Sequence, residues 1–282
     1  MAYFVLGLAA WLAVAPTLFG AETGRRYAPT IFVGGVVNGA SFTPAPDNFV
    51  APNGIISIFG AELSLQTRQV RPDDLVTGRL PHLLGNVAVS IGGLPAPLFF
   101  VSPGQINAQV PSALLPGNWV LRVNRENLLS NTVIIKVRAL SPGLFAWPSS
   151  FVEGPLRAAV THQDFTPVGR ASPEGATPAR PGELIVLWAT GFGPTTPAVF
   201  DGELPDFAAR LALPSKVWIN GVAVPEHLVF YAGQAPGLAG LYQVNVKLSE
   251  DTPSGDIEVM VEVDGVRSQP GTTIPIDPLV EQ

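Results

Sequence analysis

The stretch LFFVSPGQINAQVP, from Leu98 to Pro111, decides the fold, and its pattern is repeated in LVFYAGQAPGLAGLYQVNV, from Leu228 to Val246. Each stretch contains an apolar strand, a corner with proline and glycine, and a second strand in which apolar residues alternate with Asn or Gln. Alternation with a period of two is typical of a β-strand with one buried face. The repetition therefore predicts two copies of one β-sandwich unit.

Further elements surround this pair in the same order in both halves. The apolar run Ile55–Gly60 corresponds to Leu184–Trp188, and the hairpin Val89–Gly93 corresponds to Val217–Gly221. Gly-Gly and Asn-Gly supply the positive φ angles that a two-residue hairpin turn requires. No later stretch shows sustained helical periodicity, so we expect little helix. The pattern predicts an all-β chain of two tandem immunoglobulin-like sandwiches.

The order of elements also suggests where the chain divides. We expect a first sandwich over residues 30–140, a second over residues 141–276, and a tail of residues 277–282. The second copy begins with extra material, expected to form a hairpin or loop, and contains a glycine-rich insertion from Gly233 to Gly240. Because loops added to a scaffold often carry function, these differences between the copies are candidate functional regions.

The N-terminal residues 1–21, MAYFVLGLAAWLAVAPTLFGA, form an apolar run that ends in small residues. Such a run is typical of a secretory signal peptide. The alternative is an uncleaved membrane anchor, for which the segment before Pro16 is short. In either case the sequence predicts an exported protein, secreted or held at the cell surface, with no further contact with the membrane.

Composition excludes several classes of protein and site. The chain has no cysteine, which excludes disulfides and thiol-based metal sites or nucleophiles. The net charge is −6 and no basic stripe is present, which argues against a nucleic-acid partner. Frequent glycine and proline (29 of each) beside 47% hydrophobic residues favour many short strands joined by turns.

Several motifs together, in order along the chain, resemble one protein family. They are VVNGASF (Val36–Phe42), APNGIISIFGAELS (Ala51–Ser64), GLPAPLFFVSPGQINAQVP (Gly93–Pro111), LIVLWATGFGPTTP (Leu184–Pro197) and GLYQVNV (Gly240–Val246). The family is the Solibacter uncharacterised C-terminal domain family of exported acidobacterial proteins, and each half is also similar to IPT/TIG immunoglobulin-like modules. The resemblance implies tandem IPT/TIG-like sandwiches over about residues 36–276 and supplies no activity.

No catalytic constellation is visible in the sequence. The histidines His82, His162 and His227 lie in predicted loops, and His162 with Asp164 lacks further metal ligands. Nucleophile-elbow, zinc-protease and phosphate-loop motifs are absent. We therefore expect no catalytic residues, no metal and no cofactor. Two groups of loop carboxylates are weaker candidates for Ca²⁺ and lack EF-hand spacing: Asp201, Glu203 and Asp206, and Glu250, Asp251 and Asp256.

Aromatic and amide side chains offer the better hypothesis for a binding surface. Trp218 lies between Val217 and Ile219, so its side chain points outward if theirs point inward. Four amides are expected to share an outward position on their strands: Asn107, Gln109, Gln243 and Asn245. An exposed indole can stack on a sugar, and amides suit hydroxyl-rich ligands. The alternative is that Trp218 packs between the domains and the amides cover a solvated face. Two other tryptophans are expected in the cores: Trp119 and Trp188.

These observations leave three hypotheses of function. The first is an exported, non-catalytic module for adhesion, scaffolding or recognition, whose partner is an extracellular polysaccharide or another surface protein. The second is a carbohydrate-binding module that uses Trp218 and the amide face. The third is a hydrolase with an unrecognised site, which requires carboxylates or a histidine that converge in one cleft.

Overall fold

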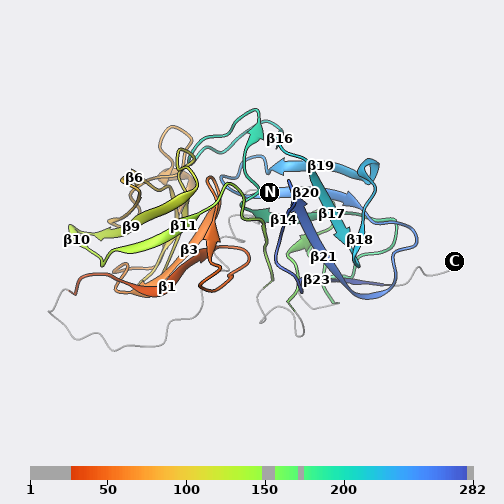
Figure 1. Ribbon diagram of the computed structural model, residues 1–282, viewed down its shortest axis with the longest axis horizontal. Coiled ribbons are helices and arrows are strands. Elements are labelled where there is room, and N and C mark those ends of the chain that lie inside the picture. The colour runs from red at the N-terminus through yellow and green to blue at the C-terminus, as the bar shows by residue number, and fades with distance from the viewer. Residues whose placement is uncertain (1–26, 148–155, 171–174, 278–282) are drawn as a thin grey trace.

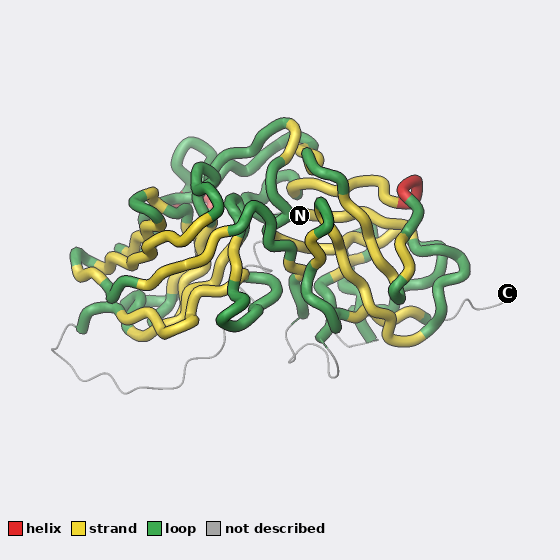
Figure 2. The backbone as a smooth tube through the Cα atoms, viewed as in Figure 1, coloured by secondary structure: helices red, strands yellow, loops and turns green. Residues whose placement is uncertain are grey.

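The computed structural model describes residues 27–147, 156–170 and 175–277, and the predicted leader, residues 1–21, lies outside them. Two β-rich halves lie side by side along the long axis of the molecule (Figure 1). Strands and loops make up nearly all of the described chain (Figure 2), and its helices are two short 3₁₀ turns, η1 (Pro72–Asp74) and η2 (Glu226–Leu228). The prediction of an all-β chain of tandem immunoglobulin-like sandwiches is confirmed.

The first half is a sandwich of two sheets, which we call sheets I and II. Sheet I has the order β1-β3-β8-β7-β4, formed by Thr30–Asn38, Ile55–Ala61, Gln105–Gln109, Leu98–Val101 and Arg68–Gln69. Sheet II has the order β2-β11-β9-β5-β6, formed by Phe49–Val50, Val133–Val137, Gly117–Arg125, Val87–Ile91 and Leu94–Pro95, with β10 (Leu128–Leu129) beside β9. The predicted corner is thus the hairpin β7–β8 in the middle of sheet I.

The second half has the same two-layer design, in sheets III and IV. Sheet III has the order β12-β14-β20-β19-β16-β15, formed by Gly143–Leu144, Leu184–Thr190, Tyr242–Lys247, Val229–Gln234, Ala209–Leu211 and Thr195–Thr196, with β13 (Val160–Thr161) beside β14. Sheet IV has the order β18-β17-β21-β22, formed by Val222–Ala223, Ser215–Ile219, Gly255–Val263 and Val266–Arg267, with β23 (Thr273–Ile276) beside β21. Chain order and sheet order therefore repeat between the halves.

Alternation along the strands builds each core. In sheet I, Ile56 pairs with Ala108 and Ile58 pairs with Ile106, and all four are fully buried. In sheet IV, Val217 pairs with Val261, and the core lies beneath them. Each fully buried aliphatic side chain contributes about 1.5–3 kcal/mol through the removal of apolar surface from water. The turns have the expected chemistry, because both residues of the Asn-Gly and Asp-Gly turns have positive φ.

Sheet I is buried on its second face as well. Ser57, Asn107 and Gln109 lie on the face opposite Ile56 and Ile58, and each has 0% exposure. Apolar residues of the second half belong to the same continuous core cluster as the first sandwich: Phe145, Ala159, Val186, Trp188, Ala235, Ala239 and Leu241. We call this contact between the two halves the seam. Trp188, expected in the core of the second sandwich, belongs to the cluster at the seam instead.

Two of the polar side chains that join the halves across the seam, Gln109 and Thr190, are fully buried and hydrogen-bond to backbone. Gln109 accepts from the Gly202 N–H through Oε1 at 2.7 Å. Thr190 Oγ1 accepts from the Ile55 N–H and donates to the Gly240 carbonyl, both at 2.8 Å. Buried backbone groups are costly when unpaired, so these side chains fix how the halves meet.

Glycine allows the backbones to approach at the seam. A Cβ on Gly240, whose φ is +65°, would lie 2.9 Å from the Asn53 carbonyl oxygen and 3.0 Å from Ile55 Cγ1. Gly240 ends the insertion in the second copy, and Ala235 and Ala239 within that insertion belong to the shared core cluster. The insertion is therefore part of the contact between the halves. A free loop would leave this apolar surface in water.

We expect Thr190→Val to reduce the free energy of unfolding by about 2 kcal/mol or more, because the Ile55 N–H and the Gly240 carbonyl lose their partner while the shape is kept. Urea denaturation followed by tryptophan fluorescence measures the change. Thr67→Val, at an exposed position of the first sandwich, is the matched control and should change stability by no more than about 0.5 kcal/mol. Equal effects of the two substitutions would contradict this account of the seam.

Candidate binding surface

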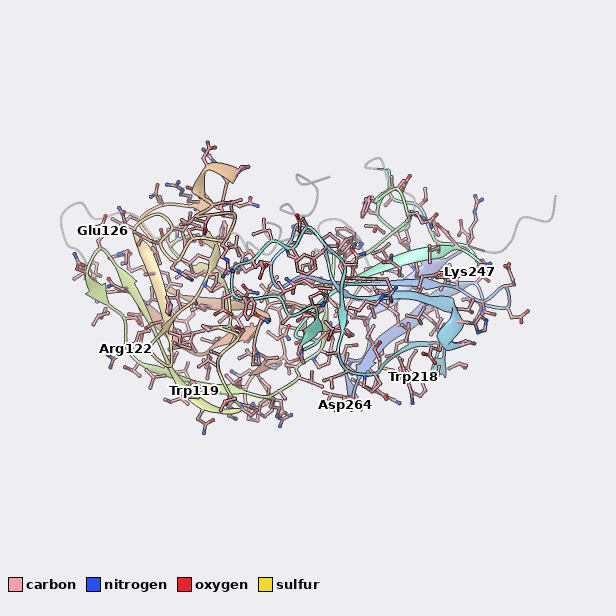
Figure 3. The ribbon with its side chains drawn as sticks, turned by 90° about the horizontal axis from the view of Figure 1, so that it is seen from above. Trp119, Arg122, Glu126, Trp218, Lys247 and Asp264 are labelled. Atoms are coloured by element: carbon pink, nitrogen blue, oxygen red, sulfur yellow. The ribbon has the colours of Figure 1, made fainter. Side chains whose placement is uncertain are left out.

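Trp218 lies on the outer face of sheet IV. Its neighbours Val217 and Ile219 are buried in the core, so the alternation of β17 directs the indole to the other side. In register beside it are Met260 of β21 and Ala223 of β18. Figure 3 shows Trp218 on the flank of the second sandwich. The alternative that Trp218 packs between the domains is wrong.

An arginine covers the indole ring. The Arg267 guanidinium carbon lies 4.1 Å from the Trp218 ring centroid, within the range of a cation–π interaction. Arg267 Nε also donates to Glu262 Oε2 at 2.8 Å. This hydrogen bond, together with the positive charges of Arg267 and Lys216, holds the pKa of the Glu262 carboxyl below its ordinary value. The indole is therefore half-buried under an ordered ion pair.

The indole Nε1–H is a buried donor that lies near the Glu262 carboxylate and helps to lower its pKa, but it makes no hydrogen bond of good geometry within the described part of the chain. A buried donor without a partner costs about 1–3 kcal/mol, which a ligand oxygen at this position would recover. The ring face and the donor become accessible together if the Arg267 side chain moves. The arrangement can therefore offer a stacking surface and a hydrogen bond to a polar ligand.

Two of the predicted amides are not on an open surface. Asn107 and Gln109 are fully buried at the seam, where Asn107 Oδ1 accepts from Ser57 Oγ at 3.2 Å and from Gln105 Nε2 at 2.8 Å. The prediction that they line a solvent-facing binding surface is wrong. Their outward position relative to the first core was inferred from strand alternation, and the second sandwich covers that side.

The other two amides lie on a different sheet from Trp218. Gln243 and Asn245 are half-buried on the face of β20 that is turned away from the second core and that also carries their register partners Trp188 and Val186, and Gln243 Nε2 lies 3.4 Å from Asn245 Oδ1. Lys247, which ends the same strand, lies away from Trp218 in Figure 3. The five predicted residues therefore occupy three separate places and do not form one site.

The histidine and carboxylate candidates for chemistry are dispersed. His162 Nδ1 contacts the Glu183 carboxylate, and Asp164 Oδ1 accepts from the Thr166 N–H at 2.9 Å. Among the described residues, no three His, Asp or Glu side chains are grouped as metal ligands. The hydrolase hypothesis requires a convergent set, and the described residues do not provide one.

Two of the three loop carboxylates in the first Ca²⁺ group have structural partners. Asp201 Oδ1 accepts from the Ser112 N–H at 2.5 Å, across the seam. Glu203 Oε2 accepts from the Phe200 N–H at 2.9 Å and lies 4.0 Å from Arg79 Nη2. These contacts hold the 200–206 loop against the first sandwich.

Asp256, from the second Ca²⁺ group, pairs with a buried arginine. Its carboxylate accepts hydrogen bonds from both terminal nitrogens of Arg157, whose side chain is 1% exposed. Arg170 Nη2 lies 3.0 Å from Asp256 Oδ2. The hydrogen bond from Arg157 is the main reason that the pKa of Asp256 lies below its ordinary value, and Arg170 adds to it. A carboxylate bound in this way is already neutralised without a metal ion.

Sequence reasoning missed Arg267. The sequence could have predicted its position. Arg267 pairs with Glu262 across the Asp-Gly hairpin. Glu262 lies on the same face of β21 as Met260, which pairs with Trp218. Counting the register through that turn would place the guanidinium near the indole. It would not show that Arg267 lies over the ring, because rotamer choice depends on the neighbouring side chains.

We expect Asp256→Asn to lower the free energy of unfolding by about 3 kcal/mol at neutral pH, because the buried Arg157 charge loses its partner. The pKa of Asp256 is lower in the folded protein than its ordinary value of 3.8. Its contribution to the free energy of unfolding is therefore fully present above pH 3.8 and is lost as the pH falls through the lower pKa of the folded state. The variant should therefore show a flatter loss of stability in acid, measured by denaturation at several pH values. Asp264→Asn, in an exposed turn, is the control, and identical acid profiles for both variants would refute the role of Asp256.

Comparisons with known proteins show likeness to solved structures alone. No family model and no curated protein matches the chain. The plexin A4 extracellular region is 10% identical over 91% of this chain, with a TM-score of 0.30, and the match covers 19% of the plexin chain. The titin domains Z1Z2 in complex with telethonin are 13% identical over 91% of this chain, with a TM-score of 0.23, and the match covers all of the titin chain. The Bacteroides ovatus SGBP-B protein of a mixed-linkage glucan utilization locus, solved with a heptasaccharide, is 10% identical over 84% (0.33), and the chain spans 46% of it. Among the described residues, no helix is long and apolar enough to cross a bilayer. These likenesses carry no argument about what the chain binds.

Proposed function

We propose that the chain is an exported, non-catalytic module that holds two β-sandwiches as one rigid body and presents their outer faces for recognition, adhesion or scaffolding. The observation that supports this proposal is the seam, where Gln109 and Thr190 bond backbone groups of the other half. Domains within a chain usually move relative to one another unless their interface is large and hydrophobic. Here the first core continues into the second half as one cluster.

The placement of ionisable groups agrees with a non-catalytic role. Enzymes require an acid, base or nucleophile held near a shared reaction position. In the described segments, His162, Asp201 and Asp256 each hold a loop or a buried arginine in place. We infer that the charged side chains of this chain mainly stabilise its loops, and that its function depends on surfaces.

The rigid-body proposal is testable by residual dipolar couplings. We expect the amides of both sandwiches to fit one alignment tensor, because the core of the first sandwich continues into the second half as one cluster. The triple variant Gln109→Ala, Thr190→Val, Asp201→Ala removes three hydrogen bonds of the seam and should give two different tensors while each sandwich stays folded. Two tensors in the unsubstituted chain would overturn the proposal.

A second candidate function is carbohydrate recognition by the outer face of sheet IV. The observation that favours it is the outward indole of Trp218, with its buried Nε1 donor and the Glu262 carboxylate beside the ring. Stacking of a sugar on an indole buries apolar C–H groups, and the surrounding polar groups can bond hydroxyls. The amides of the original hypothesis have no part in this surface.

A glycan array followed by titration calorimetry tests this candidate. We expect Trp218→Ala to weaken binding of any glycan hit about tenfold or more, through loss of the stacking surface. Arg267→Ala should strengthen binding, because it uncovers the ring. Phe230→Ala removes an aromatic side chain that is 53% exposed on another sheet and is the matched control. Equal losses for Trp218→Ala and Phe230→Ala would exclude the Trp218 surface.

A further inference from the structure

The outer face of sheet II carries three basic side chains that no acidic side chain neutralises. Arg122 lies on β9 and Lys136 on β11, and Arg138 follows Lys136 on the same side of the chain. The strands of this sheet contain no Asp or Glu, and the nearest acids in the sequence, Asp47 and Glu126, lie in flanking loops. Among the described residues, none of the three basic side chains is in an ion pair. Their positive charges are therefore available to a ligand.

These basic side chains are held in place with donors to spare. Arg122 Nε donates to Thr132 Oγ1 at 2.9 Å, which leaves its terminal N–H groups for a carboxylate. Lys136 Nζ donates to a backbone carbonyl at 2.8 Å and keeps its other N–H donors. The Arg138 guanidinium carbon lies 3.1 Å from the centroid of the Phe49 ring, and a guanidinium stacked in this way can still bond through its edge. Fixed side chains lose less conformational entropy when a ligand binds, so the face is preorganised.

The area between the basic side chains is uncharged and rich in hydrogen-bonding groups. Val120 and Ile134 are paired in register and are 41% and 60% exposed. Neutral polar side chains share their face of the sheet: Ser90, Asn118 and Asn124. Amides and hydroxyls bond sugar hydroxyls, and aliphatic side chains contact C–H groups. The centre of a protein–protein interface is enriched in aromatic residues instead, so this face suits a sugar polymer better than a protein surface.

The spacing of the basic side chains indicates what kind of anion fits. Arg122 bonds Thr132, and Lys136 lies four residues after Thr132 along the extended chain. At about 3.3 Å per residue, the two charges are therefore about 13 Å apart. Duplex DNA carries one charge per about 1.7 Å, so most of its phosphates would have no partner here. An acidic polysaccharide has at most one carboxylate per sugar unit, with hydroxyls and C–H groups between, and matches the widely spaced charges better.

The distribution of charge along the chain favours an anion at this half. Residues 30–140 contain seven Lys and Arg against five Asp and Glu, a net charge of +2. Residues 141–276 contain seven against fourteen, a net charge of −7. An anionic polymer is therefore attracted to the first sandwich and repelled by the second.

We propose that the outer face of sheet II binds an acidic polysaccharide, a linear polymer of sugars that carry carboxylates. The carboxylates bond Arg122, Lys136 and Arg138, and the uncharged parts of the sugars lie over Val120 and Ile134. This inference rests on the proposed function and deepens it, because it names the partner of one outer face of the module. Exposed ion pairs contribute little free energy each, so one contact is weak, and a polymer that presents many repeats supplies avidity when several copies are held together.

Titration calorimetry of the purified full chain with polygalacturonate and with alginate tests the proposal. We expect binding of at least one of these polymers at low ionic strength, and about 0.5 M salt should weaken it because salt screens the charges. Methyl-esterified polygalacturonate has the same sugars without the charge and is the matched ligand control. We expect it to bind at least about tenfold more weakly, since the ion pairs are lost.

A pair of variants with equal net charge makes the test specific to sheet II. The triple variant Arg122→Gln, Lys136→Gln, Arg138→Gln should raise the dissociation constant at least about tenfold. The matched control removes the same number of charges from sheets III and IV: Arg210→Gln, Lys216→Gln, Lys247→Gln. It should leave the dissociation constant within about twofold, because a distant charge is screened. Thermal unfolding checks that both variants are folded.

Four outcomes would overturn the proposal. The first is an intact chain that binds neither polymer at low ionic strength. The second is equal binding of methyl-esterified polygalacturonate. The third is a control variant that weakens binding as much as the sheet II variant, or loss of binding in Trp218→Ala, which would place the polymer elsewhere. The fourth is tighter binding of poly-L-glutamate or duplex DNA, which would assign the face to another class of macromolecule.

Failure of this proposal and failure of the proposed function give different results. If neither polymer binds while the dipolar couplings fit one tensor, the rigid module stands and the polysaccharide partner is excluded. If sheet II binds a polymer while the couplings need two tensors, the rigid-body proposal fails alone.

Discussion

The structure depends on the burial of sheet I on both of its faces. A sheet of a two-layer sandwich normally leaves one face to solvent. Here β8 places Ile106 and Ala108 in the first core and Asn107 and Gln109 beneath the second half. The buried amides need partners, and the second half supplies one for Gln109 at the Gly202 N–H. The relative position of the halves is thus fixed by hydrogen bonds that few other arrangements would satisfy.

This constraint decides which surfaces remain for function. The central strands of sheet I are covered, and the acidic 200–206 loop is held against the first sandwich through Asp201. Loops that could be mistaken for ligand sites are therefore part of the scaffold. The open strand surfaces are the outer faces of sheets II and IV and part of sheet III. Their aromatic, aliphatic and charged side chains suit contacts with macromolecules, in line with the proposed recognition or scaffolding role.

The two copies use one corner for different purposes. In the first, the amides of the strand after the corner are buried at the seam, whereas the corresponding Gln243 and Asn245 are half-exposed. The insertion before Gly240 reaches across and packs on Ile55 and Asn53. Duplication therefore kept the sandwich and changed its outer surfaces, because the core restricts the inward positions more strongly than the outward ones.

The sequence by itself determined the strands, their inward faces, the hairpin turns and the duplication, because these follow from local alternation and from turn residues that tolerate positive φ. It also determined that Trp218 leaves the core, given Val217 and Ile219 beside it. Only the tertiary structure decided that Asn107 and Gln109 are covered, that Trp188 lies at the seam and that Arg267 caps Trp218. The reason is physical: a period of two assigns a side chain to one face of a sheet, but what lies against that face is set by residues far away in the chain.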